Sequence, residues 1–251
     1  MNITDEHRQQ FKEEGFFILK AALNESELKL LRGQCQHFIN KMDARMDEEG
    51  TDTLGINHRG QRYFLSNCFR ESTELREFIF SDRMAEICRA TIGETAFLFW
   101  EQYVVKCAEV GMKFGWHQDS GYVGYPHTPY LTCWCALDDV SEENGTVHVL
   151  PFSKAGVREM VPHEKQEGTN DKVGYFGDEP GVPVIGPAGT IAVFSSVSFH
   201  CSGPNTTDKP RRSYLAQYSP DVVMLQDNSG PWGNEEPFLK DGERLTEGAA
   251  G

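Results

Sequence analysis

Two side chains with metal-binding atoms stand close together near the middle of the chain. In Trp116-His117-Gln118-Asp119, an imidazole and a carboxylate are two residues apart. On an extended strand, residues i and i+2 project from the same face. We therefore expect His117 and Asp119 to offer one nitrogen and one oxygen ligand to the same metal ion. The H-x-D pattern is weak by itself, because many chains contain it by chance.

A second histidine and an arginine follow further along the chain. His200 comes after the apolar run Thr190–Val197, which is a predicted strand, and Arg211 opens the next predicted strand. Two histidines and one carboxylate form the facial triad that is typical of non-haem Fe(II) oxygenases. A guanidinium binds a carboxylate through two parallel hydrogen bonds, so Arg211 suits a keto-acid co-substrate. The alternative is a buried His117–Asp119 pair, with His200 in the core and Arg211 on the surface.

The elements that must position these residues are predicted to be β-strands. Helical patterns occupy the first ninety or so residues, where Thr4 and Asn24 predict helix N-caps and Glu27 stands at capping-box spacing from Asn24. From about residue 95, β-branched and aromatic runs are separated by Gly, Pro and Asn. The predicted strands are Ala96–Cys107, Tyr130–Leu137, Thr146–Leu150, Val182–Ile185, Thr190–Val197 and Arg211–Tyr218.

No long helical pattern alternates with these strands, which argues against a parallel βαβ sheet. We expect a mainly β fold, a double-stranded β-helix (jelly roll) with packed N-terminal helices. One domain over residues 1–251 is predicted, with a helical part over residues 1–92 and a jelly-roll core over residues 93–220. Residues 221–251 are expected to form a C-terminal loop or tail.

The charge balance excludes several classes of partner. Lys and Arg number 24 against 38 Asp and Glu, a net charge of −14 over 251 residues. Nucleic acids and anionic membranes require concentrated positive charge, so neither is an expected partner. No apolar run approaches the roughly 18 residues of a membrane span, and the polar start Met1–Arg8 is unlike a signal peptide. The seven scattered cysteines favour a reduced, cytoplasmic chain; the oligomeric state is left open.

The motifs, taken in order, resemble those of the phytanoyl-CoA dioxygenase family of Fe(II)- and 2-oxoglutarate-dependent oxygenases. The matching pieces are Phe11…Gly15-Phe16, Trp116-His117-Gln118-Asp119, Asn144-Gly145-x4-Leu150-Pro151-x-Ser153, Gly189-Thr190-x3-Phe194 and His200-x-Ser202-Gly203-Pro204-Asn205-x5-Arg211. They span roughly residues 8–220. Each motif is weak alone, and together they are specific.

The resemblance implies a jelly roll that binds Fe(II) at its mouth and uses 2-oxoglutarate and O2, with release of succinate and CO2. It implies His117, Asp119 and His200 as the metal ligands and Arg211 as the salt-bridge partner of the distal carboxylate of 2-oxoglutarate. It further implies co-substrate contacts from Ser202, Trp134 and Gln102. Related halogenases lack the carboxylate that Asp119 provides, which favours hydroxylation or another oxidation.

The substrate is expected to be a small neutral or mildly charged metabolite. An acyl-CoA would require clustered Lys and Arg, and the chain shows such a cluster only at Lys209-Pro210-Arg211-Arg212. Pocket-lining candidates follow the H-x-D motif at Tyr122, Tyr125, His127 and Tyr130. The alternative for these four residues is a polar loop with packed aromatics.

Two other functions remain open from the sequence alone. One is a jelly-roll isomerase or hydrolase that uses the same ligands for zinc or manganese, which leaves Arg211 and Trp134 unexplained. The other is a non-catalytic jelly-roll binding module, which needs neither the triad nor the arginine. The polar, glycine-rich segment Pro162–Gly181 is expected to be either a lid over the mouth of the barrel or a solvated surface loop.

Overall fold

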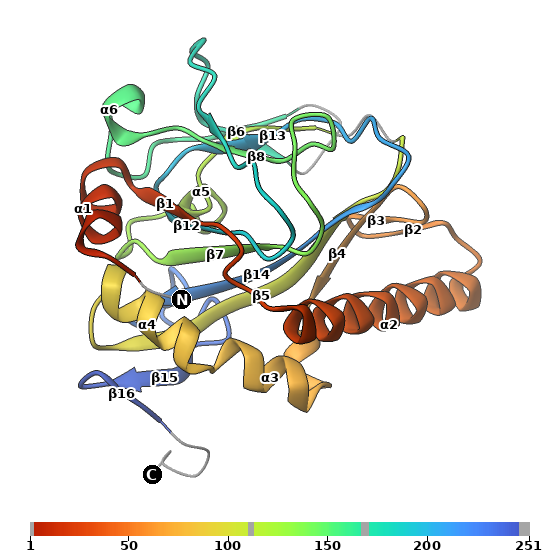
Figure 1. Ribbon diagram of the computed structural model, residues 1–251, viewed down its shortest axis with the longest axis horizontal. Helices are drawn as coiled ribbons and strands as arrows, with labels where there is room; N and C mark the ends of the chain where they lie inside the picture. The colour runs from red at the N-terminus through yellow and green to blue at the C-terminus, as the bar shows by residue number, and fades with distance from the viewer. Residues whose placement is uncertain (1–2, 110–112, 167–170, 246–251) are drawn as a thin grey trace.

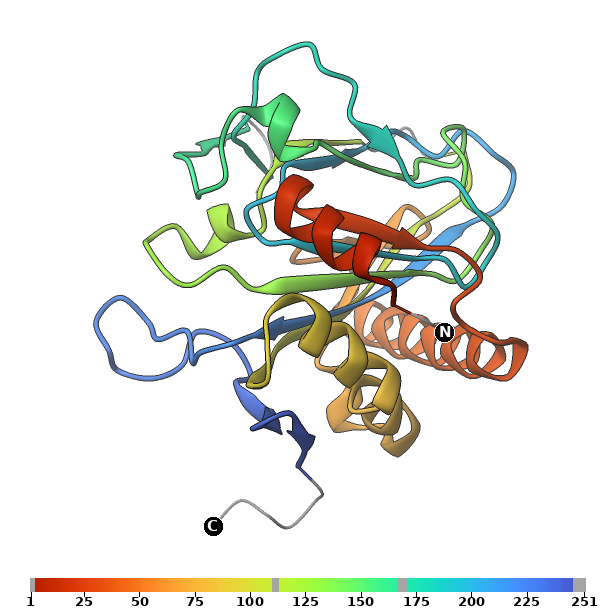
Figure 2. The same cartoon turned by 60° about the vertical axis from the view of Figure 1, so that its left-hand side comes forward.

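The computed structural model describes residues 3–109, 113–166 and 171–245. Three layers are stacked in these residues: helices, a large antiparallel sheet and a small antiparallel sheet (Figure 1). The turned view shows the same order, with α2, α3 and α4 on the outer side of the large sheet (Figure 2). None of the described helices is long and apolar enough to cross a bilayer.

The longer helices begin where the sequence predicts N-caps. The side chain of Thr4 accepts a hydrogen bond from the His7 N–H, and Asn24 and Glu27 form the expected capping box. The helices are α1 (Asp5–Glu14), α2 (Glu25–Glu49), α3 (Thr73–Ile79), α4 (Asp82–Thr91), α5 (Ser120–Val123) and α6 (Phe152–Ala155), with a 3₁₀ turn η1 at Cys68–Arg70. The apolar face of α2 buries Leu28 and Leu31 as the periodicity predicts.

The large sheet carries one wall of the barrel. Its order is β1 (Phe16–Leu19), β12 (Ile191–Ser195), β7 (Leu131–Ala136), β14 (Arg211–Ser219), β5 (Ala96–Lys106), β4 (Arg62–Ser66), β3 (Asn57–His58) and β2 (Thr53–Leu54). β15 (Glu236–Lys240) also pairs with β5, and β16 (Glu243–Arg244) pairs with β15. The paired strands run antiparallel.

The small sheet forms the facing wall. Its order is β11 (Val182–Pro183), β8 (Val147–Val149), β13 (His200–Ser202) and β6 (Phe114–His117), and a separate hairpin joins β9 (Glu164–Lys165) to β10 (Lys172–Val173). One hydrophobic core lies between the helices and the outer face of the large sheet, and a second lies between the two sheets. Two facing antiparallel sheets with helices packed outside confirm the predicted jelly roll.

Two parts of the sequence-based description are wrong. The first ninety residues are not uniformly helical, because β1 pairs with β12 and β4 pairs with β5. These strands are short, and their partners lie 36 to 178 positions away in the chain, as in the pairs Ser66–Gln102 and Phe16–Phe194. The C-terminal part also contains β15 and β16 and is not merely a loop.

A candidate iron and co-substrate site between the two sheets

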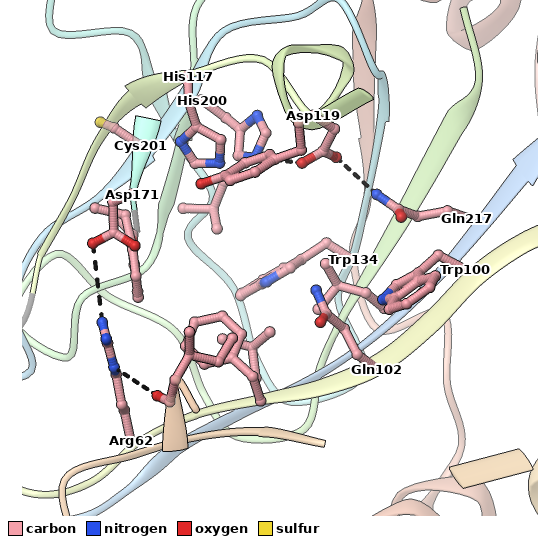
Figure 3. Close-up of a pocket in the computed structure, with 18 of the residues that line it drawn as sticks. Arg62, Trp100, Gln102, His117, Asp119, Trp134, Asp171, His200, Cys201 and Gln217 are labelled. Carbon is pink, nitrogen blue, oxygen red and sulfur yellow. Dashed lines mark hydrogen bonds and ion pairs between the residues drawn. The ribbon is translucent and has the colours of Figure 1, made fainter. Parts of the chain in front are cut away.

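A cavity of about 370 Å³ opens between the two sheets. The expected metal ligands and co-substrate contacts all line it: His117, Asp119, His200, Arg211, Ser202, Trp134 and Gln102. Figure 3 shows the two histidines and Asp119 on one side of this cavity, with Trp134 and Gln102 across from them. Residues from five strands, β5, β6, β7, β13 and β14, are therefore brought together as the sequence predicts.

The register of the small sheet brings the two histidines together. His117 at the end of β6 and His200 at the start of β13 are direct cross-strand partners, and their ring centroids are 4.2 Å apart. The Nδ1 atom of His117 lies 2.8 Å from the Gly115 carbonyl, and that of His200 lies 3.2 Å from the Ser198 carbonyl. A carbonyl only accepts hydrogen bonds, so each Nδ1 carries the hydrogen and each Nε2 is left for a metal ion.

The third member of the group, Asp119, is placed differently from the prediction. Its backbone is helical (φ −58°, ψ −37°), and it is the N-cap of α5 and not part of an extended strand with His117. Its Oδ2 atom accepts hydrogen bonds from the Thr132 hydroxyl at 2.7 Å and the Gln217 amide at 2.9 Å. The other oxygen, Oδ1, is thereby directed to the histidines and lies 3.5 Å from His200 Nε2.

These three side chains, the His-Asp-His cluster, fit a divalent metal ion. One ligand atom from each lies within 4.8 Å of the others. Burial, together with the neighbouring His200, lowers the pKa of His117 to about 3, so its imidazole is neutral at ordinary pH and can act as a ligand. Two imidazole nitrogens and one carboxylate oxygen are the donor set of Fe(II) oxygenases.

The opposite part of the cavity carries buried positive charge. Arg62, Lys106 and Arg211 are direct cross-strand neighbours on β4, β5 and β14, and at most 8% of each residue is exposed. We call these three residues the cationic row. Burial lowers the pKa of Arg211 to about 10, while burial and the nearby Arg211 lower the pKa of Lys106 to about 6. An anion bound here would favour the charged forms of these groups and offset the cost of burying them.

The hydrogen bonds of the cationic row leave capacity for an anionic ligand. Arg211 donates from Nη1 to the Ser213 hydroxyl, and among the described residues its buried Nε has no hydrogen-bond partner. The guanidinium carbon lies 5.5 Å from the centre of the Trp134 ring. Lys106 donates to the Ser202 hydroxyl at 2.7 Å and to the Gly203 carbonyl. Because the Ser202 oxygen accepts from Lys106, its own hydrogen is free to point elsewhere.

The remaining predictions about the site have mixed outcomes. Tyr122 and Tyr130 line the cavity, whereas Tyr125 and His127 do not. The Tyr125 hydroxyl donates to the Met224 carbonyl, and His127 Nε2 lies 3.1 Å from the Ser120 hydroxyl. The alternative that made Arg211 a surface cation is wrong, because only 1% of this residue is exposed.

The segment Pro162–Gly181 reaches the mouth of the cavity. Asp171 lines the cavity and lies 3.9 Å from Arg62, and Tyr175 packs against Trp116 and Phe199. Residues 167–170 of this segment lie outside the described residues. The position of Asp171 places part of this segment beside the His-Asp-His cluster (Figure 3).

Sequence reasoning missed several residues of the site. Thr132 and Gln217 orient Asp119, and Lys106 contacts Ser202, yet none of the three belongs to a motif. Strand alternation does place Gln217 on the same face of β14 as Arg211. Lys106 lies within the predicted strand Ala96–Cys107, and a lysine there has no distinctive spacing. Only the pairing of β5, β7 and β14 identifies them as neighbours of the cluster.

A jelly roll with a His-Asp-His cluster facing a buried arginine defines the class of mononuclear non-haem iron oxygenases that use a keto acid. The model of the family described as phytanoyl-CoA dioxygenase (PhyH) matches residues 11–213. The chain belongs to this family. It is an Fe(II)- and 2-oxoglutarate-dependent oxygenase that acts on a small molecule. This membership decides against an isomerase or hydrolase that uses zinc or manganese, and against a non-catalytic module.

Individual relatives are distant. The 2-aminoethylphosphonate dioxygenase of the uncultured bacterium HF130_AEPn_1 is 26% identical over 225 residues, which cover 86% of this chain and 81% of the relative. Among solved structures, the non-haem alpha-ketoglutarate-dependent carbocyclase SnoK from nogalamycin biosynthesis superposes with a TM-score of 0.71 at 20% identity, covering 98% and 97% of the two chains. EvdO2 from Micromonospora carbonacea var. aurantiaca, complexed with 2-oxoglutarate, gives 0.68 at 23% identity, covering 92% and 95%. These structural likenesses support the fold.

Proposed function

We propose that this protein hydroxylates a small-molecule substrate, with Fe(II) bound by His117, Asp119 and His200 and 2-oxoglutarate bound by Arg211 and Ser202. The proposal depends on one observation: the same cavity contains the His-Asp-His cluster, which suits a metal ion, and the buried Arg211, which suits a carboxylate. Three ligand atoms lie within 4.8 Å of one another, and in the described part of the chain the buried Nε of Arg211 has no partner. A dicarboxylate spanning the two sites satisfies both.

When bound, Fe(II) supplies the activation of O2 that couples oxidation of 2-oxoglutarate to oxidation of the substrate. The overall reaction balances: R–H, O2 and 2-oxoglutarate give R–OH, succinate and CO2. One oxygen atom of O2 enters succinate and the other enters the product. The carboxylate of Asp119 takes the position that a halide would need, which supports hydroxylation over halogenation.

The chain contributes binding and orientation. The carbonyls of Gly115 and Ser198 fix the two imidazoles, and Thr132 and Gln217 fix the carboxylate of Asp119. Such outer contacts hold the ligand atoms in place before the metal arrives. The cationic row neutralises the distal carboxylate of 2-oxoglutarate, and Trp134 and Gln102 are the proposed flanking contacts.

The setting of the enzyme is inferred from its composition. A cytoplasmic location is supported by the seven cysteines, all of which are free. A net charge of −14 supports a small molecule, and not a nucleic acid, as the partner.

The proposal is tested by anaerobic titration of the protein with Fe(II) and 2-oxoglutarate. Chelation of iron by the keto acid should produce a visible charge-transfer absorption. The variants His117→Ala, Asp119→Ala and His200→Ala should each bind iron more weakly and lose succinate formation, because each lacks one of three ligands.

His148→Ala is the matched control for the loss of a histidine from the same sheet. His148 lies on β8 as the cross-strand partner of Cys201 and does not line the cavity. The absorption band and the succinate formation of His148→Ala should equal those of the wild type. Normal iron binding and succinate formation in all three ligand variants would refute the assignment.

A further inference from the structure

The cavity has two chemically different ends, separated along the length of β5. Trp100, Gln102 and Val104 of this strand line the cavity in alternation. Lys106 follows on the same face of β5 and pairs with Arg62 and Arg211, which both line the cavity. At about 3.4 Å per residue, Trp100 lies roughly 20 Å from Lys106. The cationic row stands at the Lys106 end. At the other end, which we call the aromatic end, four rings line the cavity: Phe99, Trp100, Tyr130 and Trp232.

A β-bulge brings two consecutive residues of β5 to the aromatic end. Trp100 pairs with Gln217 of β14, but Leu98 pairs with the adjacent Tyr218, so Phe99 has no partner on β14. A bulge re-aims a side chain that strict alternation would send to the opposite face. Phe99 and Trp100 consequently both line the cavity.

The fourth ring comes from the segment 220–235, which connects β14 to β15. Trp232 stacks on Phe99 with centroids 5.3 Å apart and an interplanar angle of 15°, and its ring lies 5.9 Å from that of Trp100. The next residues hold it there, because the Asn234 N–H donates to the Phe99 carbonyl at 2.8 Å. The segment thus closes the aromatic end with a ring from the C-terminal part of the chain.

The aromatic end offers amides and no cation. The amides of Gln102 and Gln217 lie beside it (Figure 3). Among the described lining residues the Lys and Arg side chains are Arg62 and Arg211, both in the cationic row, and Arg62 faces Asp171 at 3.9 Å. A phosphonate or carboxylate placed among the rings would be desolvated without an opposite charge, at a large cost in free energy.

We infer that the substrate is an uncharged molecule with a flat, unsaturated ring system, held by Trp100 and Trp232 beside the His-Asp-His cluster. This inference rests on the proposed function, because the cationic row is assigned to the co-substrate. Flat rings gain from face and edge contacts with aromatic side chains beyond the area they bury. The cavity of about 370 Å³ also has to accommodate 2-oxoglutarate. This volume is near the lower end of the range of roughly 300–1,000 Å³ that ligand pockets occupy. The small volume favours a compact ring system over a long acyl chain.

The test compares 2-naphthol with one analogue that is charged and one that is not flat. 2-Naphthol is flat and uncharged, naphthalene-2-sulfonate is flat and anionic, and decahydro-2-naphthol is uncharged but saturated and not flat. Calorimetric titration into the protein loaded anaerobically with Fe(II) and 2-oxoglutarate should show 2-naphthol binding about tenfold or more tightly than either analogue.

Variants of Trp232 assign the effect to the aromatic end. Trp232→Leu keeps an apolar side chain without a ring and should weaken 2-naphthol binding about tenfold, whereas Trp232→Phe should largely retain it. Leu225→Ala is the control, because Leu225 belongs to the same segment, is 38% exposed and does not line the cavity. Its affinity for 2-naphthol should equal that of the wild type.

The failure of this inference is separable from failure of the proposed function. A normal iron–keto-acid absorption band together with equal binding of all three probes, or with no effect of Trp232→Leu, overturns the substrate class and leaves the oxygenase site intact. Absence of the band refutes the iron site itself. Titration of the metal-free protein with 2-naphthol still measures the aromatic end in that case.

Discussion

At the scale of single residues, two adjacent arginines have opposite surroundings. Arg211 faces the cavity and is 1% exposed, whereas Arg212 projects from the other face of β14. There the guanidinium of Arg212 binds both carboxylate oxygens of Asp138, at 3.0 and 2.6 Å. Arg211 is therefore available to bind an anionic ligand, whereas Arg212 links β14 to the segment that follows β7.

Arg211→Ala should weaken 2-oxoglutarate binding by roughly 2–5 kcal/mol, because the distal carboxylate would lose a bidentate partner in a buried site. Titrating the iron absorption with 2-oxoglutarate gives the dissociation constant. Arg212→Ala should leave this constant nearly unchanged and instead lower the free energy of unfolding by about 1–3 kcal/mol, since a charge-assisted pair is lost. A larger loss of affinity in Arg212→Ala than in Arg211→Ala would contradict the assignment.

At the scale of elements, the turn before β8 supports the segment that follows β13. Gly145 has a φ of +72°, and a Cβ added there would lie 2.5 Å from the Gly203 carbonyl oxygen and 2.8 Å from that of Pro204. The Asn144-Gly145 motif is therefore needed for close backbone approach as well as for the turn. Ser202, which contacts Lys106, immediately precedes the crowded segment.

Gly145→Ala should displace residues 203–204, destabilise the protein and weaken 2-oxoglutarate binding. Gly156→Ala is the matched control, because Gly156 has a φ of +73° and nothing within 4 Å of an added Cβ. The free energy of unfolding of the control should fall by only roughly 1–2 kcal/mol, which is the cost of an alanine in the left-handed backbone region. Urea unfolding and the 2-oxoglutarate dissociation constant distinguish the two variants. Equal values for both would show that the close approach has no consequence.

The contact between Asp171 and Arg62 should hold the segment Pro162–Gly181 against the mouth of the cavity. Phe176 in this segment is 69% exposed and is a natural site for chymotrypsin. Asp171→Asn should speed cleavage after Phe176, because a neutral amide attracts the buried guanidinium less. Asp178→Asn, an exposed change in the same segment, should leave the cleavage rate as it is. Identical rates in the two variants would favour the plain surface loop over a lid.

At the scale of the whole molecule, β5 buries a carboxyl group under the helical layer. Glu101 is fully buried, and burial raises the pKa of its carboxyl to about 7 from an ordinary value near 4.5. The folded protein thus binds more protons than the unfolded chain between these two values. Stability from this group is present at low pH and is lost as pH rises through about 7.

As the pH rises from 5 to 8, the free energy of unfolding of the wild type should fall by about 3 kcal/mol because of Glu101. Glu101→Gln should flatten this slope when urea unfolding is measured at one-unit steps of pH. Glu235, whose pKa burial also raises to about 7, acts with the same sign, so Glu235→Gln should remove a further part of the slope. A slope unchanged by Glu101→Gln would mean that the carboxyl is not buried in solution.

The sequence by itself determines the features that depend on local spacing. The N-caps at Thr4 and Asn24, the strand that begins at Arg211 and the opposite faces of Arg211 and Arg212 all follow from neighbouring residues. The types and order of His117, Asp119 and His200 likewise predict the metal chemistry, because coordination needs those donor atoms whatever the fold.

Only the tertiary structure decides which distant residues meet. The cross-strand pair His117–His200, the donors Thr132 and Gln217 on Asp119, and the stacking of Trp232 on Phe99 join positions 13 to 133 residues apart. Periodicity and capping residues indicate which face of a helix or strand is buried and where the element begins and ends. They contain no information about which other element packs against it. The partner and the register come from burying apolar faces against each other and pairing backbone groups, which is a property of the whole chain.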